Sequence, residues 1–407
     1  MIKIIHSKAA PALMTRKSVR LREAEQAVRP ILDAVRDRGD AALLEYARKF
    51  DGFGGRSVRV PVEGSLGAEL QRAVEVAAAN IRETACQQLP RERMTEYPDG
   101  RRIGEIVRPL DSMGAYIPGG RYPLLSTILM TVIPAQVAGV KHICVACPKP
   151  VPEILGLSAR LQVHELFQMG GAQAIAALAF GTETVPKVDC IVGPGNIYVA
   201  AAKKLLAGEV AIDFIAGPTE IVIIAAEGDP RWLAADMLAQ AEHDVDASSI
   251  LLTTSRALAE AVAADIERQL ATLPTAAVAR PSIDTNGAII LVDSLAEAVD
   301  LSNTLAPEHL SLHDPGLLPS IRHAGSVFLG ASSPEAAGDY ASGPNHVLPT
   351  SGAARLYGGL SAADFVKVIS VQELTPAALA RLASSITTLA RAEGLEAHAR
   401  SVEVRSA

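Results

Sequence analysis

The dipeptide Glu-His occurs twice in this 407-residue sequence, in LAQAEHD (residues 238–244) and in APEHL (residues 306–310). If the first segment is helical, Gln240 and His243 lie at i and i+3 and share a face, so an amide oxygen and an imidazole can point the same way. Such a pair can bind zinc if other segments supply the remaining ligands. The alternative is a helix end whose polar side chains are simply solvated.

The second pair follows a segment with helical periodicity, SLAEAVDLSNTL. Pro307 starts a turn there, so we expect Glu308 and His309 to be displayed from a loop or a helix end. Histidine titrates near neutral pH and the pKa of a glutamate can be tuned by its surroundings, so both residues can transfer protons. The pattern is typical of catalytic acids and bases, with a surface dipeptide as the alternative.

A third polar segment, residues 335–359, crowds glycine, serine, proline and asparagine around Asp339 and His346. A long segment without apolar periodicity is either functional or disordered. Four of its larger side chains need burial, which disfavours a flexible linker: Tyr340, Val347, Leu348 and Tyr357. We therefore expect this segment to be functional.

A glycine turn, GPGNIY at residues 193–198, begins like the dinucleotide fingerprint G-x-G-x-x-G but has Tyr198 in place of the third glycine. Asp213 lies about 20 residues further on, where that fingerprint has an acid that binds ribose. The segment therefore predicts a dinucleotide-type turn with an incomplete fingerprint.

The elements that must position these residues alternate between strands and helices. Helices are expected over residues 24–50 and 66–89. Short apolar runs then end in glycine-rich turns that start helices, which predicts βαβ units and parallel sheets. Cys144 and Cys147 lie in the run HICVACP, which reads as a buried strand, so their side chains should point to opposite faces. Near the end, Thr375 and Pro376 should begin a final helix.

Composition limits the class of protein. A chain of 407 residues exceeds one hydrophobic core, and 49% hydrophobic but only 4% aromatic residues favour an α/β protein. The net charge of −7, with no basic run longer than two residues, argues against nucleic-acid binding. No segment has the length of a signal-peptide core or a membrane span, so we expect a cytoplasmic protein.

Taken together, the motifs resemble those of the histidinol dehydrogenase family over nearly the whole chain. The resemblance rests on eight segments in the family's order: GAYIPGG, GGAQAIAALAFGT, VDCIVGPGNIYVAAAK, AGPTEIVIIA, LAQAEHD, APEHL, GDYASGPNHVLPTSG and EGLEAH. It implies NAD-dependent, zinc-requiring oxidation of L-histidinol through L-histidinal to L-histidine.

The resemblance also implies roles for particular residues. His309 would be the general base and Glu308 would activate water. The implied zinc ligands are Gln240, His243, Asp339 and His398. The implied substrate contacts are Thr219, Gln240, His243, His309, Asp339, His346, Glu393 and His398. The implied NAD contacts are Tyr116, Gln173 and Asn196.

We expect two Rossmann-like doubly wound domains and a small helical tail. The first domain would combine residues 19–113 and 221–361 after an arm of residues 1–18, and the second would comprise residues 114–220. Residues 362–407 form a segment too small to fold alone. In the family, this tail packs on the other subunit of a homodimer, so His398 and Glu393 would complete the partner's site.

Two departures bear on the substrate. Family members commonly have serine where this chain has Thr219, and Ser311 follows APEHL where an acid is expected. Relatives of the family oxidise other small alcohols, including sulfonated polyols. The remaining alternatives are a zinc hydrolase that uses Glu308 to activate water and a ligand-binding module without chemistry.

Overall fold

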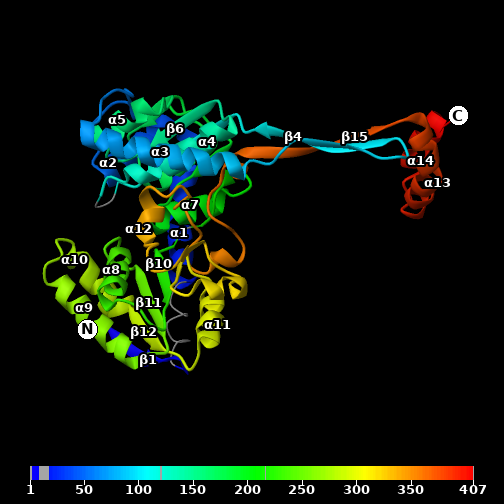
Figure 1. Cartoon of the computed structure of the whole chain (residues 1–407). Helices are drawn as coiled ribbons and strands as arrows, with labels where there is room; N and C mark the ends of the chain where they lie inside the picture. Colours follow the sequence, from blue (N-terminus) through cyan, green and yellow to red (C-terminus); the bar gives the residue numbers. More distant parts are fainter. Residues whose placement is uncertain (1, 9–17, 120–121, 216, 407) are drawn as a thin grey trace.

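The computed structural model describes residues 2–8, 18–119, 122–215 and 217–406. These residues form two lobes, each built on a six-stranded sheet, and a long ribbon that projects from one of them (Figure 1). We call the two parts the lower lobe and the upper lobe, after their places in Figure 1. The expected α/β class, with two mainly parallel sheets, is confirmed.

The lower lobe contains a parallel sheet in the order β1-β12-β11-β10-β13-β14. Its strands are β1 (Lys3–His6), β10 (Glu220–Ile224), β11 (Ser248–Thr253), β12 (Ala288–Leu291), β13 (His309–Leu312) and β14 (Ser326–Leu329). One face is covered by α8 (Pro230–Ala241), α9 (Arg256–Leu270) and α10 (Ala276–Asn286), and the other by α11 (Leu295–Leu305). Ile223 packs in the first cluster and Ile224 in the second, so β10 is apolar on both faces.

The upper lobe contains the sheet β2-β7-β6-β5-β8-β9, in which only β2 is antiparallel to its neighbour. Its strands are β2 (Arg59–Val60), β5 (Ser112–Tyr116), β6 (His142–Ala146), β7 (Glu165–Phe167), β8 (Cys190–Val192) and β9 (Ala211–Ile212). One face carries α1 (Ser18–Arg38), α2 (Asp40–Asp51), α6 (Gly171–Phe180) and α7 (Ile197–Leu206). The other carries α3 (Ala68–Gln88), α4 (Leu125–Ala138) and α5 (Pro152–Arg160).

The placement of residues 19–113 with residues 221–361 was wrong. The helices of this segment pack in the upper lobe, where α1 contacts α6 and α7 and α3 contacts α4. The apolar stripe of α1, with Val28 and Val35 fully buried, shows that one face of the helix must be covered, but the stripe does not say by which sheet. Within the expected arm of residues 1–18, β1 is an edge strand of the lower sheet, while residues 9–17 lie outside the described part.

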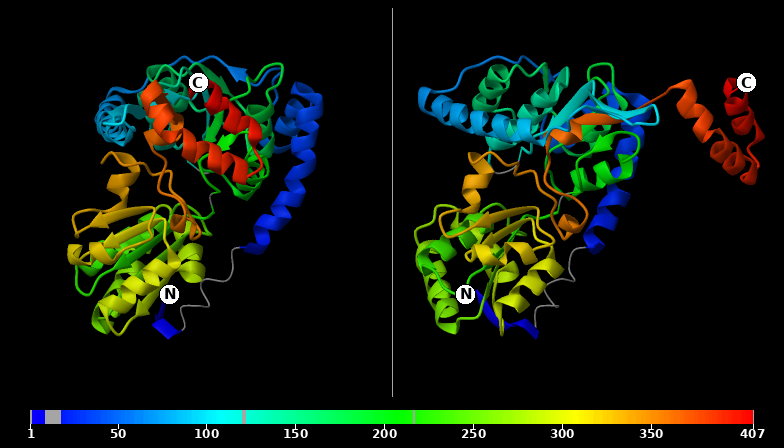
Figure 2. Two further views of the ribbon diagram at one scale, coloured as in Figure 1. Left: turned by 90° about the vertical axis from the view of Figure 1, so that its right-hand side faces the viewer. Right: turned by 45° about the vertical axis from the view of Figure 1, so that its right-hand side comes forward.

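The projecting ribbon pairs β4 (Arg101–Pro109) with β15 (Val366–Leu374) in an antiparallel ladder, and β3 (Arg93–Glu96) joins β4 nearer its far end. Helices α13 (Pro376–Ala392) and α14 (Glu396–Ser406) lie at its far end, away from both lobes (Figure 2). Thr375 caps α13 by accepting a hydrogen bond from the Ala378 amide at 3.2 Å, as predicted. The ribbon therefore holds the tail out from the rest of the chain.

Short helices complete the fold. The helix α12 (Glu335–Tyr340) lies between the lobes, and the 3-10 helices are η2 (Pro315–Ser320), η3 (Ala353–Arg355) and η4 (Ala362–Phe365). Phe365 is fully buried in the upper lobe, so the expected tail leaves the body only after η4. None of the helices in the described part of the chain combines the length and apolarity of a membrane span.

Candidate active site

Glu308 and His309 lie in the interior of the lower lobe, at the start of β13. Ala306 ends α11 with a φ of 50°, and the chain then enters the sheet between β10 and β14, where His309 pairs with Ile221 of β10. Glu308 is 6% exposed and His309 is 3% exposed. Glu308 lies in the loop between α11 and β13 as expected, whereas His309 lies in a strand and not in a loop or helix end. The alternative of a surface dipeptide was wrong.

The carboxyl group of Glu308 is held through one oxygen. Its Oε2 accepts hydrogen bonds from the Thr219 hydroxyl at 2.5 Å and from the Glu220 amide at 2.9 Å. Burial raises the pKa of Glu308 to about 7, against the opposing effects of His309 and these hydrogen bonds. Glu308 can therefore exchange a proton near neutral pH through its second oxygen.

His309 is surrounded by acids. Its Nδ1 lies 3.3 Å from the Glu220 carbonyl oxygen and 3.7 Å from Glu308 Oε2, and its Nε2 lies 3.7 Å from Asp339 Oδ1. Burial alone lowers its pKa, but the carboxyl groups of Glu335, Glu308 and Asp339 outweigh burial and raise the pKa to about 10. Nε2 is buried and has no hydrogen-bond partner among the described residues, so it is the nitrogen left for a ligand.

Gln240, at the end of α8, is fully buried between Thr219 and Glu335. The single proton of the Thr219 hydroxyl goes to Glu308, so the Gln240 amide nitrogen donates to that hydroxyl at 2.6 Å and its oxygen faces Glu335. A proton on Glu335, whose pKa burial raises, satisfies this contact between two oxygens. The opposite orientation of the amide satisfies it as well, because the Gln240 nitrogen then donates to Glu335 Oε1 at 2.8 Å. The sequence reasoning missed Glu335, which lies only four residues before Asp339.

One wall of the site offers metal ligands. His243, Glu335 and Asp339 place ligand atoms within 4.8 Å of one another, and His243 Nε2 lies 3.7 Å from Asp339 Oδ2. His243 and Asp339 line a cavity of about 480 Å³ whose walls come from α3 and α4 of the upper lobe and from α8 and α12. The site thus opens between the two lobes.

His346 links this wall to the upper lobe by contacting both Asp339 and Thr127. Its Nδ1 donates to the Asp339 carbonyl oxygen at 2.9 Å, and its Nε2 lies 3.4 Å from the Thr127 hydroxyl of α4. The segment 335–359 is therefore ordered around the site, with Val347 and Leu348 buried as expected. Burial was wrongly predicted for Tyr340 and Tyr357, which are both exposed.

The expected NAD contacts gather at the carboxyl edge of the upper sheet. Tyr116 ends β5 and its hydroxyl accepts from the Gly171 amide at 3.1 Å, at the start of α6. Asn196 follows β8 and caps α7, accepting from the amides of Tyr198 and Val199. Because β6 and β8 lie on opposite sides of β5, the connections diverge there, which is typical of a nucleotide-binding crevice.

Gln173 lies beside this crevice and is held by an acid that the sequence reasoning missed. Its amide donates to Asp51 Oδ2 at 3.1 Å, and the Gly170 amide donates to the same oxygen at 3.0 Å. Burial raises the pKa of Asp51, although both hydrogen bonds oppose that effect. Asp51 comes from α2, so only the packing of α2 on α6 brings the two residues together.

Asp213 does not face the crevice as a ribose-binding acid. It forms an ion pair of 2.7 Å with Lys203, and the two side chains are only 1% and 2% exposed. Asp213 also accepts from the Gly193 amide at 2.8 Å, and Lys203 donates to the Gly193 carbonyl at 2.6 Å. The pair therefore fixes the glycine turn, where a Cβ on Gly193 would lie 2.2 Å from the Tyr116 carbonyl oxygen.

Glu393 and His398 are not brought to this site within one chain. Glu393 ends α13 and His398 lies in α14, and both are exposed on the tail beyond the ribbon (Figure 2). The structure thus brings together the expected residues of the lower lobe and places these two apart from them.

Comparisons with known proteins agree over nearly the whole chain. A family model described as histidinol dehydrogenase matches residues 14–406. The histidinol dehydrogenase of Geobacillus kaustophilus is 49% identical over 398 residues, and that of Thermus thermophilus is 50% identical over 391 residues, with 94% of each chain covered in both cases. The crystal structure of histidinol dehydrogenase from Elizabethkingia anophelis matches with a TM-score of 0.92 at 37% identity and covers 100% of this chain and 98% of that one. An acetylating aldehyde dehydrogenase from Geobacillus thermoglucosidasius shares the fold alone, with a TM-score of 0.52 at 14% identity over 90% of this chain and 94% of that one.

Proposed function

The chain belongs to the histidinol dehydrogenase family of oxidoreductases, and we propose that it oxidises L-histidinol through L-histidinal to L-histidine, reducing two NAD molecules. The observation that carries this proposal is the buried Nε2 of His309, which has no hydrogen-bond partner in the described part of the chain and lies 3.7 Å from an acid lining the cavity between the lobes. Such a nitrogen is suited to take a proton from a substrate hydroxyl.

In the first oxidation, His309 removes the hydroxyl proton while hydride leaves the adjacent carbon. The hydrogen bond from Nδ1 to the Glu220 carbonyl fixes the ring and leaves Nε2 as the acceptor. The raised pKa of His309 means that the surrounding acids keep its ring protonated when no cation is bound nearby. A cation held at Asp339 would lower that pKa and leave His309 free to act as the base.

In the second oxidation, Glu308 takes a proton from water so that the aldehyde becomes its hydrate, whose oxidation yields the acid. The Thr219 hydroxyl and the Glu220 amide both bind Oε2, which leaves Oε1 for this water. A pKa of about 7 lets Glu308 accept that proton and release it again near neutral pH.

The residues at the cavity wall fit a zinc ion. Imidazole nitrogen and carboxylate or amide oxygen are ligands that zinc accepts in open sites. We propose Gln240, His243 and Asp339 from one chain and His398 from the partner subunit. Zinc there would anchor the imidazole and amine of the substrate and offset the acids around His309, whereas zinc itself undergoes no redox change.

The upper lobe fits NAD at the carboxyl edge of its sheet. Tyr116, Gln173 and Asn196 would contact the dinucleotide, and the amino ends of α6 and α7 would attract its pyrophosphate. NAD would accept hydride there, and the cavity between the lobes would admit the alcohol.

We further propose a homodimer in which Glu393 and His398 of each tail complete the partner subunit's site. In the tail, α13 contacts α14 and β15, and large apolar side chains on the tail are exposed: Leu374, Leu389, Leu395 and Val404. Exposed apolar surface of this kind favours a protein partner. Thr219 and His346 would then line the substrate pocket with the partner's residues.

A substrate panel tests the reaction. The purified protein is mixed with NAD and with L-histidinol, a plain amino alcohol or a sulfonated polyol, and NADH absorbance is followed. We expect the highest kcat/KM with L-histidinol. A higher value with a sulfonated polyol would assign the chain to another substrate, and NAD-independent hydrolysis in place of NADH formation would indicate the hydrolase alternative.

A further inference from the structure

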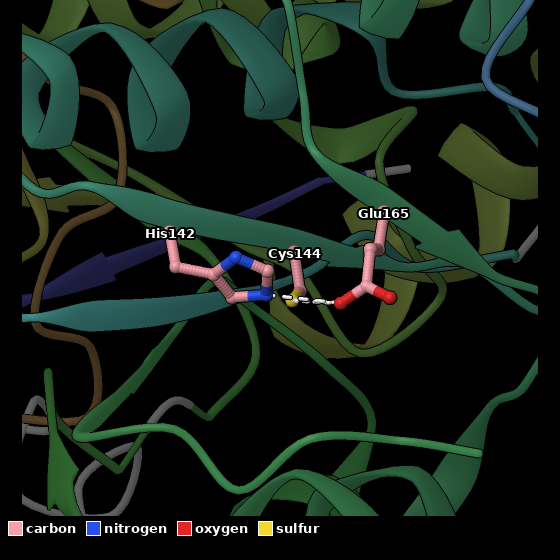
Figure 3. A group of neighbouring side chains, drawn as sticks. All are labelled: His142, Cys144 and Glu165. Carbon is pink, nitrogen blue, oxygen red and sulfur yellow. Dashed lines mark hydrogen bonds and ion pairs between the residues drawn. The ribbon is translucent and has the colours of Figure 1, made fainter.

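A second group of metal-binding side chains lies in the upper lobe, on the neighbouring strands β6 and β7. Cys144 pairs with Glu165 across the two strands, and His142 lies two residues before Cys144 and so on the same face. Figure 3 shows the three side chains converging on one point. His142 Nε2 lies 2.9 Å from Glu165 Oε2, and Cys144 Sγ lies 3.7 Å from the same oxygen.

We propose that His142, Cys144 and Glu165 bind a divalent cation of the zinc type, separate from the cation proposed between the lobes. Imidazole nitrogen, thiolate sulfur and carboxylate oxygen are the three ligand types that zinc accepts. Ligand atoms at roughly 2.0–2.3 Å from a tetrahedral zinc lie roughly 3.3–3.8 Å from one another. The observed ligand atoms all lie within 4.8 Å of one another, so small side-chain movements close the site.

The surroundings of Glu165 hold it in place for such an ion. Arg59 of β2 binds the other carboxylate oxygen, Oε1, which leaves Oε2 to the site. An outer partner of this kind orients a ligating carboxylate. The ring of His142 also packs beside that of His164, with centroids 5.3 Å apart.

The site has an open side. The side chains of His142 and Glu165 are 37% and 15% exposed, while Cys144 is fully buried. Glu165 and Arg59 also line a surface cavity of about 420 Å³. An ion can therefore enter from this side, and water can serve as its fourth ligand.

The C-x-x-C pattern is not the basis of this site. Cys144 packs in the cluster under α1 and α6, whereas Cys147 packs in the cluster under α4, so the two thiols point to opposite faces as the sequence predicted. Binding at Cys144 converts the thiol to a thiolate and releases one proton to solvent. The proton on His142 Nε2 moves to Nδ1, so the ring stays neutral when Nε2 binds the ion.

The cation is expected to stabilise the sheet and not to take part in the oxidation. His142 lies opposite Ser112, at the amino end of β5, whereas Tyr116 lies at the carboxyl end. Four residues of strand separate the two levels by roughly 13 Å. An ion bound there ties β6 to β7 and should raise the melting temperature without changing kcat.

Measuring the bound metal in variants distinguishes this site from the site proposed between the lobes. The full-length protein is equilibrated with zinc, and bound metal is compared among wild type, Cys144→Ser, His142→Gln and Cys147→Ser. We expect Cys144→Ser and His142→Gln each to bind one equivalent less than wild type. Cys147→Ser, which changes a buried thiol directly after the same strand, should keep the full amount. Cobalt in place of zinc should give a thiolate-to-cobalt absorption band that Cys144→Ser and His142→Gln both lose and Cys147→Ser keeps.

Activity with histidinol checks that each variant is folded and is expected to stay near the wild-type value. His142→Gln changes a partly exposed side chain and should fold. The proposal can therefore still be tested with this variant if Cys144→Ser fails to fold. Equal metal content in wild type and His142→Gln, or a cobalt spectrum without a thiolate band, would overturn the proposal. Because the comparison is a difference between variants, it does not depend on whether the cavity between the lobes holds zinc.

Discussion

Three buried carboxyl groups surround the ring of His309. Glu308, Glu335 and Asp339 all lie within 4.0 Å of its ring nitrogens, and all three are largely shielded from water. Such a cluster is costly unless protons or a cation offset the charge. A proton on Glu335 would reduce this charge, and a cation at Asp339 would reduce it further and free His309 to act as a base.

The division of labour between Glu308 and His309 predicts different losses in the two oxidations. Glu308→Gln removes the proton acceptor for water but keeps the size of the side chain and can still bond to Thr219. We expect oxidation of supplied histidinal to fall about 100 to 10,000-fold. Oxidation of histidinol to the aldehyde should fall much less. Single-turnover NADH formation from each substrate measures the two steps, and equal losses would contradict the assigned role.

Residues that stand in recognisable motifs could be found from the sequence. Gln240, His243, Glu308 and Asp339 meet in the lower lobe as expected. Glu335 escaped notice because no pattern marks an acid whose importance comes from burial against Gln240. The burial of His309 was missed for a related reason, since the sequence around Pro307 shows a turn but not the depth of the strand that follows.

At the scale of single elements, the buried pair Lys203–Asp213 fixes the loop between β8 and α7. Asp213→Asn keeps the hydrogen bond to Gly193 but leaves the ammonium group of Lys203 buried without a counter-charge. Removing one partner of a buried pair commonly costs about 3–5 kcal/mol. We expect a lower melting temperature and a higher KM for NAD.

The double variant Lys203→Met with Asp213→Asn provides the control. Methionine fills much of the volume of lysine without its charge, so we expect the double variant to melt above Asp213→Asn alone. A double variant that is less stable than the single one would show that the charge of Lys203 is not the cause.

Helix α8 carries an acid whose effect on stability depends on pH. Burial raises the pKa of Asp236 to about 6. A raised carboxyl pKa means that the folded state holds a proton that the unfolded state releases, so stability falls as pH rises from about 4 to 6 and stays low above. Asp236→Asn should therefore match wild type near pH 4 and melt higher at pH 8. A difference in melting temperature that does not vary with pH would contradict this origin.

Most helices and strands could be located from periodicity and capping residues. Thr375 and Pro376 mark the start of α13, and the run EIVII marks a strand covered on both faces. The sheet on which a helix packs could not be deduced, and residues 19–113 were assigned to the wrong lobe for that reason. An amphipathic stripe specifies burial but not the partner.

At the scale of the whole molecule, the tail is held too far from its own site to complete it. If His398 instead completes the partner subunit's site, two inactive variants should restore each other. In a heterodimer of His243→Ala with His398→Ala, one site carries both changes and the other carries neither. Activity should approach one working site per heterodimer, with subunit exchange confirmed by mass. No recovery after confirmed exchange would refute the shared site.

The central claim is that one site carries out both oxidations of histidinol with His309 as the base. The most direct measurement is the amount of NADH formed from a limiting amount of L-histidinol, for wild type and for His309→Asn. We predict two NADH and one histidine per histidinol for wild type. The variant should be about 100 to 10,000-fold slower with its metal content unchanged. One NADH per histidinol with aldehyde accumulating, or an unchanged rate in His309→Asn, would contradict the account.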